Sequence, residues 1–299
     1  MNHVLVTGHN GFLGTNLVHE LEKKFKVFGI SNSLRKNPKI CQLKKDIQKI
    51  KVSDIPRNIS CIVHLAAQTD IDFCQKNPVK CFDVNVYGTQ KILDISKKLN
   101  SKFIFLSTSH VFGFPQKLPI DENHSRLPTT IYAASKIAGE VICERYARSY
   151  GMDISIVRLF SVYGPYSSPH LVTNKIINQT INNKKLQLGN ITPKRDFIFI
   201  NDAIDAILLT IKKSRGLEIF NVGTGTATSI SQLCKMVEKI SKRKISIDTI
   251  KSLKRGNEIS KIYANPQKIK KLGWKPKTSL YEGLKKTYNW YLSKSKDSL

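Results

Sequence analysis

The first half of the chain alternates short apolar runs with longer amphipathic stretches. The apolar runs have the length of β-strands and occupy residues 3–7, 26–30, 61–66, 103–107 and 154–159. Alternation of this kind predicts right-handed βαβ crossovers and therefore an α/β fold built on a doubly wound parallel sheet. In such a sheet a nucleotide binds at the carboxyl ends of the strands.

Beyond about Gly164, helical patterns are mixed with isolated apolar runs at residues 196–200, 218–222 and 245–250. We therefore expect a dinucleotide-binding and catalytic domain at residues 1–164, followed by a smaller α/β, mainly substrate-binding domain at residues 165–299. No long linker or low-complexity segment separates them. The two parts should pack together, and some segments of the second should return to the first sheet.

A glycine-rich turn, TGHNGFLG at residues 7–14, follows the first strand and opens the first helix. Glycine permits the turn and lets the backbone approach a pyrophosphate, which then lies at the helix N-terminus. We therefore expect a dinucleotide site here. It should include Gly8, Gly11, Phe12, Leu13 and Gly14.

The end of the second strand is where the adenosine ribose is recognised. NAD-selecting proteins usually place an acidic side chain there, whereas this chain has Ser31 and Asn32, followed by Arg35 and Lys36. Hydroxyl and amide groups near a guanidinium suit a 2′-phosphate. We therefore expect NADP(H) in preference to NAD(H). The alternative is that Arg35 and Lys36 are ordinary loop charges and NAD binds without its usual acid.

Tyr132 and Lys136 stand four residues apart at the start of a strong helical pattern, which places them one turn apart on the same face. Free tyrosine has a pKa near 10 and is a poor base at neutral pH. An ammonium about 4 Å away contributes about 4 kcal/mol at an effective dielectric near 20, which would lower the pKa of Tyr132 by about 3. Upstream, LSTSHVFG at residues 106–113 offers hydroxyls at the same sheet edge.

Taken together, these segments resemble the extended short-chain dehydrogenase/reductases, the epimerase/dehydratase family of nucleotide-sugar enzymes. The matching segments run through nearly the whole chain and are residues 7–14, 46–47, 64–67, 85–89, 107–108, 132–136, 158–165, 195–198, 221–225 and 272–276. The resemblance implies a Rossmann-type sheet with a smaller substrate-binding part on its C-terminal side.

The resemblance also implies a role for each catalytic residue. Thr108, with Ser107 nearby, polarises the sugar oxygen that gains or loses a proton. Tyr132 transfers that proton. Lys136 holds the nicotinamide ribose and tunes Tyr132, and Asn85 supports the helix and active-site waters.

Further contacts with the cofactor follow from the same resemblance. Asp46 and Ile47 correspond to the acidic pair position that meets adenine. Leu65, Ala66 and Ala67 belong to the matching segment after the next strand and are expected to bind the cofactor.

The second half of the chain is expected to hold the substrate's anion. Arg195 matches the family arginine that meets the diphosphate, for which a bidentate guanidinium is suited. Either Lys254 or Arg255 corresponds to a second basic contact, and the sequence leaves the choice open. Ser161 stands where the family often has an asparagine that contacts substrate.

Three reactions share this machinery: 4,6-dehydration, 4-epimerisation and reduction of a 4-keto sugar. Family dehydratases follow the catalytic threonine with Asp-Glu, whereas this chain has Ser109 and His110, which disfavours dehydration. Whether His110 acts as an acid or packs and hydrogen-bonds stays open. Reduction needs a cofactor that exchanges at each turnover, which fits NADPH. We favour reduction of a nucleoside-diphosphate 4-keto-6-deoxyhexose, in deoxysugar biosynthesis, over NAD-dependent 4-epimerisation of the UDP-glucose/galactose type.

The formal charge of +27 raises nucleic acid as a partner. The lysines are spread over polar helix positions with few aromatics between them, so we expect a solvated surface rather than a nucleic-acid site. A non-catalytic member that senses dinucleotide or binds nucleic acid is the third alternative, and the retained Thr108, Tyr132 and Lys136 argue against it.

The six cysteines are scattered singly and no histidine cluster has metal-ligand spacing, so we expect reduced thiols and no metal. No apolar run is long enough to span a bilayer and no signal-peptide pattern is present, which predicts a cytoplasmic protein without a membrane partner. By resemblance, the chain should form a homodimer through helices near residues 85–99 and 135–150.

Overall fold

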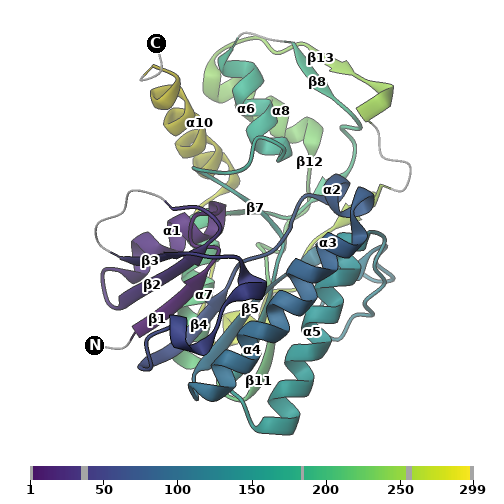
Figure 1. The fold of residues 1–299 in the computed structure, drawn as a ribbon. Helices are drawn as coiled ribbons and strands as arrows, with labels where there is room; N and C mark the ends of the chain where they lie inside the picture. The colour runs from purple at the N-terminus through teal and green to yellow at the C-terminus, as the bar shows by residue number, and fades with distance from the viewer. Residues whose placement is uncertain (1–2, 35–39, 183–184, 254–257, 297–299) are drawn as a thin grey trace.

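The computed structural model describes residues 3–34, 40–182, 185–253 and 258–296. A seven-stranded sheet lies at the centre of its larger part (Figure 1), in the order β11-β6-β5-β4-β1-β2-β3. All neighbouring strands are parallel. The strands are β1 (His3–Thr7), β2 (Lys26–Ser31), β3 (Cys41–Lys44), β4 (Ile59–His64), β5 (Lys102–Thr108), β6 (Ile154–Leu159) and β11 (Leu217–Val222). The predicted parallel α/β sheet is confirmed.

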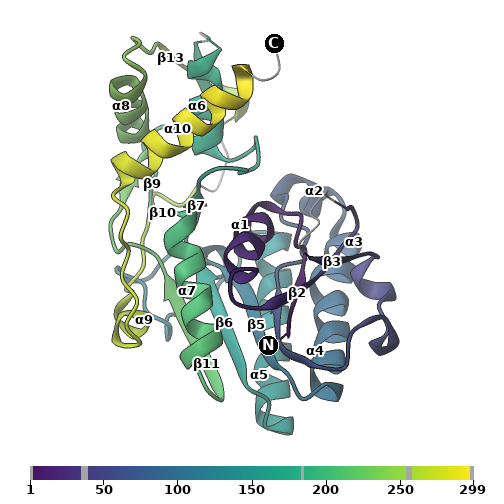
Figure 2. The same cartoon turned by 90° about the vertical axis from the view of Figure 1, so that its left-hand side faces the viewer.

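Helices cover both faces of this sheet. On one face lie α1 (Phe12–Leu21) and α7 (Ile200–Lys213) (Figure 2). The other carries α2 (Ile71–Lys76), α3 (Pro78–Phe82), α4 (Gly88–Lys98) and α5 (Ile131–Tyr150). Side chains alternate along a strand, so Val4 and Val6 pack in the core with α1 and α7, and Leu5 packs in a second core with α4 and α5. The sheet is therefore doubly wound.

The strand expected at residues 61–66 is displaced toward the N-terminus. β4 runs from Ile59 to His64. Leu65 and Ala66 lie beyond the strand and line a cavity at the carboxyl ends of the strands. Their apolar character, which prolongs the sequence pattern, reflects partial burial in that wall rather than strand pairing.

The smaller part contains three short sheets and four helices within the described residues. β7 (Ser161–Tyr163) pairs with β10 (Phe197–Phe199), and β8 (Leu186–Leu188) pairs with β13 (Ile247–Thr249). The third sheet has the order β12 (Thr228–Ser229), β9 (Lys194–Arg195), β14 (Lys261–Ile262). The helices are α6 (Val172–Ile181), α8 (Ile230–Ser241), α9 (Gln267–Lys271) and α10 (Leu280–Lys296).

A single apolar core joins the two parts. Ile204 of α7, Leu233 of α8 and Leu284 of α10 belong to one buried cluster with the strand residues Val4 and Val6. Segments beyond residue 164 also return to the large sheet, because β11 forms its edge beside β6 and α7 covers one face. Among the described helices none is long and apolar enough to cross a membrane.

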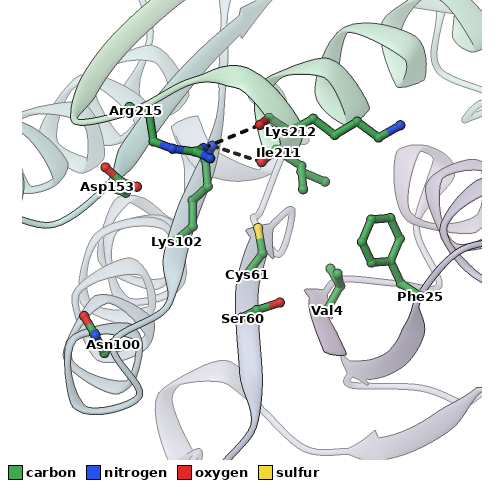
Figure 3. Close-up of a pocket in the computed structure, with 10 residues that line it drawn as sticks. All are labelled: Val4, Phe25, Ser60, Cys61, Asn100, Lys102, Asp153, Ile211, Lys212 and Arg215. Carbon is green, nitrogen blue, oxygen red and sulfur yellow. Dashed lines mark hydrogen bonds between the residues drawn. The ribbon is translucent and has the colours of Figure 1, made fainter. Parts of the chain in front are cut away.

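At the amino ends of β1, β4 and β5 lies a cavity of about 390 Å³ (Figure 3). The Nζ of Lys102, the first residue of β5, donates to the carbonyl oxygens of Thr210 (2.7 Å), Ile211 (3.0 Å) and Ser214 (2.5 Å). The last carbonyls of a helix have no partner within the helix. Lys102 therefore caps α7 and ties it to the sheet.

Candidate active site

A second cavity, of about 470 Å³, opens at the carboxyl ends of β1, β2 and β4 beside the start of α1. Twelve of the residues predicted to bind the cofactor line it. They are Gly8, Gly11, Phe12, Leu13, Gly14, Ser31, Asn32, Asp46, Ile47, Leu65, Ala66 and Ala67. Arg35 lies outside the described residues. The fold thus brings segments from four loops around one space.

The glycines of the turn are required by close backbone contacts. Gly8 has φ +70°, and a Cβ there would lie 2.8 Å from the backbone nitrogen of Ala66. A Cβ on Gly14 would overlap the carbonyl oxygen of Gly8. The start of α1 thus remains open to the cavity, so its free N–H groups can meet a pyrophosphate.

The wall of this cavity contains polar residues that the sequence analysis did not single out. Asn10, Ser33, Lys45 and Gln48 all line it. The Nδ2 of Asn10 donates to the carbonyl oxygen and the hydroxyl of Ser33, which joins the glycine turn to the loop after β2. Their places between or beside predicted residues were the available signal: Asn10 lies within the glycine turn, and Lys45 directly precedes Asp46.

The predicted proton-transfer residues meet at the same edge of the sheet. Thr108 is the last residue of β5, and Tyr132, near the start of α5, is hydrogen-bonded to it. The helix is fixed at its start by Thr130, whose hydroxyl accepts from the backbone N–H of Ala133 at 3.1 Å. One turn further, the Nζ of Lys136 lies 4.0 Å from the centroid of the Phe105 ring.

The electrostatics of Tyr132 differ from the expectation. Burial raises the pKa of Tyr132 to about 12, and the hydrogen bond from Thr108 opposes this only in part. Burial also lowers the pKa of Lys136 to about 8, against the carboxylate of Glu140, which raises it. The expectation that Lys136 lowers the pKa of Tyr132 by about 3 is wrong for the protein's own groups, because desolvation penalises both charged forms.

Asn85 owes its position to an irregularity between α3 and α4. Residues Asp83–Tyr87 form a π-helical turn, an element that often marks functional sites. The Nδ2 of Asn85 donates to the carbonyl of Gln68 and to the hydroxyl of Ser135, both at 2.9 Å, and its Oδ1 accepts from the N–H of Gln68 at 2.7 Å. Asn85 thus links the loop after β4 to α5 beside Tyr132, which agrees with a supporting role.

The hydroxyl of Ser107, the residue before Thr108, is engaged by a buried carboxylate of α5. This hydroxyl donates to the Glu140 carboxylate at 2.5 Å, and Glu140, fully buried on α5, also binds Arg158 at 2.8 Å and Arg126 at 3.1 Å. Successive residues of a strand point to opposite sides. The hydroxyl of Ser107, expected near the Thr108 that polarises the sugar oxygen, therefore belongs to an ion cluster that anchors α5, and a part for Ser107 in the reaction stays a prediction.

Arg195 and Ser161 are brought together at the start of the smaller part. Ser161 follows β6, and its N–H donates to the carbonyl of Asp196 at 2.9 Å. The Arg195 guanidinium is partly exposed and lies 3.9 Å from the Glu258 carboxylate. The buried carboxylate of Asp196 accepts three backbone N–H groups and one hydroxyl, which fixes this strand. Lys254 and Arg255 lie outside the described residues.

His110 and two cysteines complete the surroundings of Tyr132. The exposed His110 ring stands edge-on to the Tyr132 ring with 6.0 Å between centroids. Cys74 and Cys81, which look unrelated in sequence, are buried and hydrogen-bonded to each other near Tyr132. Burial raises the pKa of Cys74 to about 12, so this group is a thiol that fills space, as buried cysteines usually do.

The GDP-mannose 4,6 dehydratase family model matches residues 5–287. Among full-length relatives, the chain is 31% identical to a putative UDP-glucose 4-epimerase of Methanocaldococcus jannaschii, covering 96% of this chain and 97% of the relative. It is 30% identical to the human dTDP-D-glucose 4,6-dehydratase, covering 96% and 89%.

Solved structures of similar proteins share the whole fold. The UDP-glucose 4-epimerase of Thermotoga maritima, solved with UDP-glucose, is similar with a TM-score of 0.90 and 28% identity, covering 98% of this chain and 99% of that one. The UDP-glucuronic acid 4-epimerase of Bacillus cereus, in complex with UDP-glucuronic acid and NAD, gives a TM-score of 0.91 and 28% identity, with the same coverage.

Proposed function

The chain belongs to the extended short-chain dehydrogenase/reductase family of nucleotide-sugar epimerases and dehydratases, and from that premise we propose that it reduces a nucleoside-diphosphate 4-keto-6-deoxyhexose at C4. The observation that carries this choice is the end of β2. There Ser31 and Asn32 line the cofactor cavity where an NAD-binding protein usually presents a carboxylate. That composition favours NADPH, the cofactor of a reaction that consumes one hydride donor per turnover.

The residues around C4 fit the reductive direction. When bound, a reduced nicotinamide supplies the hydride that C4 receives. Thr108 hydrogen-bonds the keto oxygen, and Tyr132 donates its phenolic proton to that oxygen as the C–O bond becomes an alcohol. A Tyr132 pKa raised to about 12 keeps the phenol protonated at neutral pH, as a proton donor requires. Lys136 holds the nicotinamide ribose.

The substrate's diphosphate is assigned to Arg195, whose guanidinium offers two parallel N–H donors. The pair with Glu258, at 3.9 Å, is longer than a hydrogen bond, so an anion can displace the Glu258 carboxylate there.

Epimerisation at C4 is the second candidate, and the comparisons favour it. The relatives include 4-epimerases, and the similar structure from Bacillus cereus was solved with NAD. An epimerase oxidises C4, retains the reduced cofactor while the keto-sugar rotates, and returns the hydride to the other face. Dehydration is disfavoured because Ser109 and His110 follow Thr108.

The two reactions separate in one experiment. The purified protein is incubated with NADPH or NADH and a panel of nucleotide 4-keto-6-deoxyhexoses, and separately with UDP-glucose without added cofactor. For a reductase we expect little retained dinucleotide, stoichiometric NADPH consumption and no conversion of UDP-glucose to UDP-galactose. Tightly retained NAD together with that conversion would establish the epimerase. Tyr132→Phe, which should bind the nucleotide sugar but not turn over, is the control.

A homodimer is part of the proposal. Large apolar side chains are exposed on and beside the two helices predicted to pair. They are Val79 (72% exposed), Phe82 (37%), Tyr87 (51%), Val141 (43%) and Tyr150 (52%). Exposed apolar side chains on neighbouring helices favour a covering partner, which is the second chain in this proposal. Light scattering at micromolar concentration should give twice the mass of one chain, and a strictly monomeric mass would count against the dimer.

A further inference from the structure

Lys45 stands beside the place where the adenosine ribose is recognised. It follows β3 directly, and its backbone N–H donates to the carbonyl of Ser31, the last residue of β2, at 2.9 Å. In the same parallel pair, Ser31 is in register with Lys44. Lys45 thus enters the cavity wall next to Ser31 and Asn32, from a different strand and a different loop.

The ammonium of Lys45 is held by a fixed carboxylate. Its Nζ lies 2.6 Å from the Oδ2 of Asp54, which also accepts the backbone N–H of Lys51 at 2.8 Å. An ammonium has three N–H donors, and the described contacts of Lys45 use one of them. Its side chain is 30% exposed and lines the cofactor cavity, so a ligand in that cavity can approach it.

The charges in the cavity wall are few. Among the described residues that line it, Lys45 and Asp46 alone carry ionisable side chains. Asp46 lies at the start of a short 3-10 helix (Ile47–Lys49), at the position assigned to adenine. The ribose end therefore combines one cation, the hydroxyls of Ser31 and Ser33 and the amide of Asn32. This is a donor set suited to a phosphate and not needed for a neutral 2′-hydroxyl.

We propose that Lys45 binds the 2′-phosphate of NADPH. The preference for NADPH over NADH then depends on the residue after β3 as well as on the loop after β2. The inference rests on the proposed use of NADPH and adds to it a specificity residue. One N–H of the Lys45 ammonium stays hydrogen-bonded to Asp54 when the phosphate binds. The lysine is therefore positioned before the cofactor binds. A ligand that lacks the 2′-phosphate does not engage Lys45.

The test compares two lysines of the same segment. Lys45→Met removes the charge from the cavity wall and keeps the length of the side chain. Lys49→Met removes an equal charge four residues further on, at an exposed position outside the cavity lining, and is the matched control. Dissociation constants of NADPH and NADH are measured for each variant by nicotinamide fluorescence, and circular dichroism confirms that each variant is folded.

We expect Lys45→Met to weaken NADPH binding by about 10-fold or more, the effect of a hydrogen bond to a charged group, and to leave NADH within about 2-fold. Lys45→Arg should retain the discrimination, and Lys49→Met should change neither constant by more than about 2-fold. Equal losses for the two cofactors would place Lys45 at the shared pyrophosphate or adenine and overturn the proposal. No loss for either would also overturn it.

The outcomes separate this inference from the proposed reaction. If the protein reduces 4-keto sugars but Lys45→Met retains full NADPH affinity, the proposed reaction stands and the proposed role of Lys45 is wrong. If the protein reduces no 4-keto sugar but Lys45→Met selectively weakens NADPH binding, the proposed role of Lys45 stands and the proposed reaction is wrong.

Discussion

The two ends of the central sheet each carry a cavity and a lysine, and the two lysines differ in what satisfies them. At the amino end, Lys102 donates to three carbonyl oxygens at the end of α7. At the carboxyl end, Lys136 is 4% exposed and lies over the Phe105 ring. Among the residues that the structure describes, none accepts a hydrogen bond from its ammonium.

Neither cavity volume nor pKa distinguishes the two sites. The amino-end cavity, of about 390 Å³, is nearly as large as the cofactor cavity. Burial lowers the pKa of both lysines. The difference lies in the hydrogen bonds. The partly buried ammonium of Lys102 donates to three backbone carbonyls and so serves the fold, whereas the ammonium of Lys136 has no acceptor among the described protein groups, as expected of a group that binds a ligand.

The largest effect is expected for Lys136→Met. Activity should fall by about 100- to 10,000-fold, the range for loss of a group that supports proton transfer. Stability at pH 7 should stay the same or rise, because a desolvated ammonium is replaced by an apolar chain of similar length. Steady-state kinetics and thermal unfolding check this, and a variant that loses stability along with activity would make Lys136 structural like Lys102.

Lys102→Met should lower stability and leave activity nearly unchanged, the reverse of Lys136→Met. Three charge-assisted hydrogen bonds and a favourable interaction with the helix dipole are lost, so we expect a destabilisation of about 1.5 to 3 kcal/mol. The site at the other end of the sheet keeps its geometry, so kcat/KM at 25 °C should remain within about 2-fold. Urea unfolding and kinetics measure the two quantities. A large fall in activity without loss of stability would contradict the structural role of Lys102.

The pH dependence of stability sharpens the comparison. Lys136 has a folded-state pKa lowered to about 8 from an unfolded value of 10.5. Between these values the unfolded chain binds more protons than the folded one, so this group makes stability rise with pH across that window. The contribution has a limit of about 1.4 kcal/mol per pH unit. Wild type and Lys136→Met, unfolded with urea at pH 7 to 10, should differ in slope, with the flatter curve for the variant.

The smallest effect is expected within the carboxyl end itself. Ser107→Ala removes one donor to Glu140, which keeps both arginines, so we expect a loss of about 1 kcal/mol with activity nearly unchanged. Thr108→Ala, which removes the neighbouring hydroxyl, is the contrasting variant and should lower kcat with little effect on stability. If Ser107→Ala lowered kcat as strongly as Thr108→Ala, both hydroxyls would belong to the reaction.

Local patterns in the sequence were sufficient for the sheet, the glycine turn and the Tyr132–Lys136 spacing. These depend on periodicity and on contacts between near neighbours. The partner of Ser107 is Glu140, 33 residues away, and the pKa of Tyr132 depends on burial by the whole fold. Neither can be found from a local pattern. The π-helical turn that presents Asn85 has no distinct sequence signal, because its residues are those of an ordinary helix.

The position of β11 at the edge of the large sheet affects how the chain folds during synthesis. β6 acquires its outer neighbour only when residues 217–222 have been synthesised, more than 50 residues after β6 itself. Until then the nascent chain presents β6 as an open strand edge, the type of edge that pairs with other chains. A fragment that stops at residue 164 would keep this edge permanently, so the dinucleotide-binding half should aggregate when produced alone.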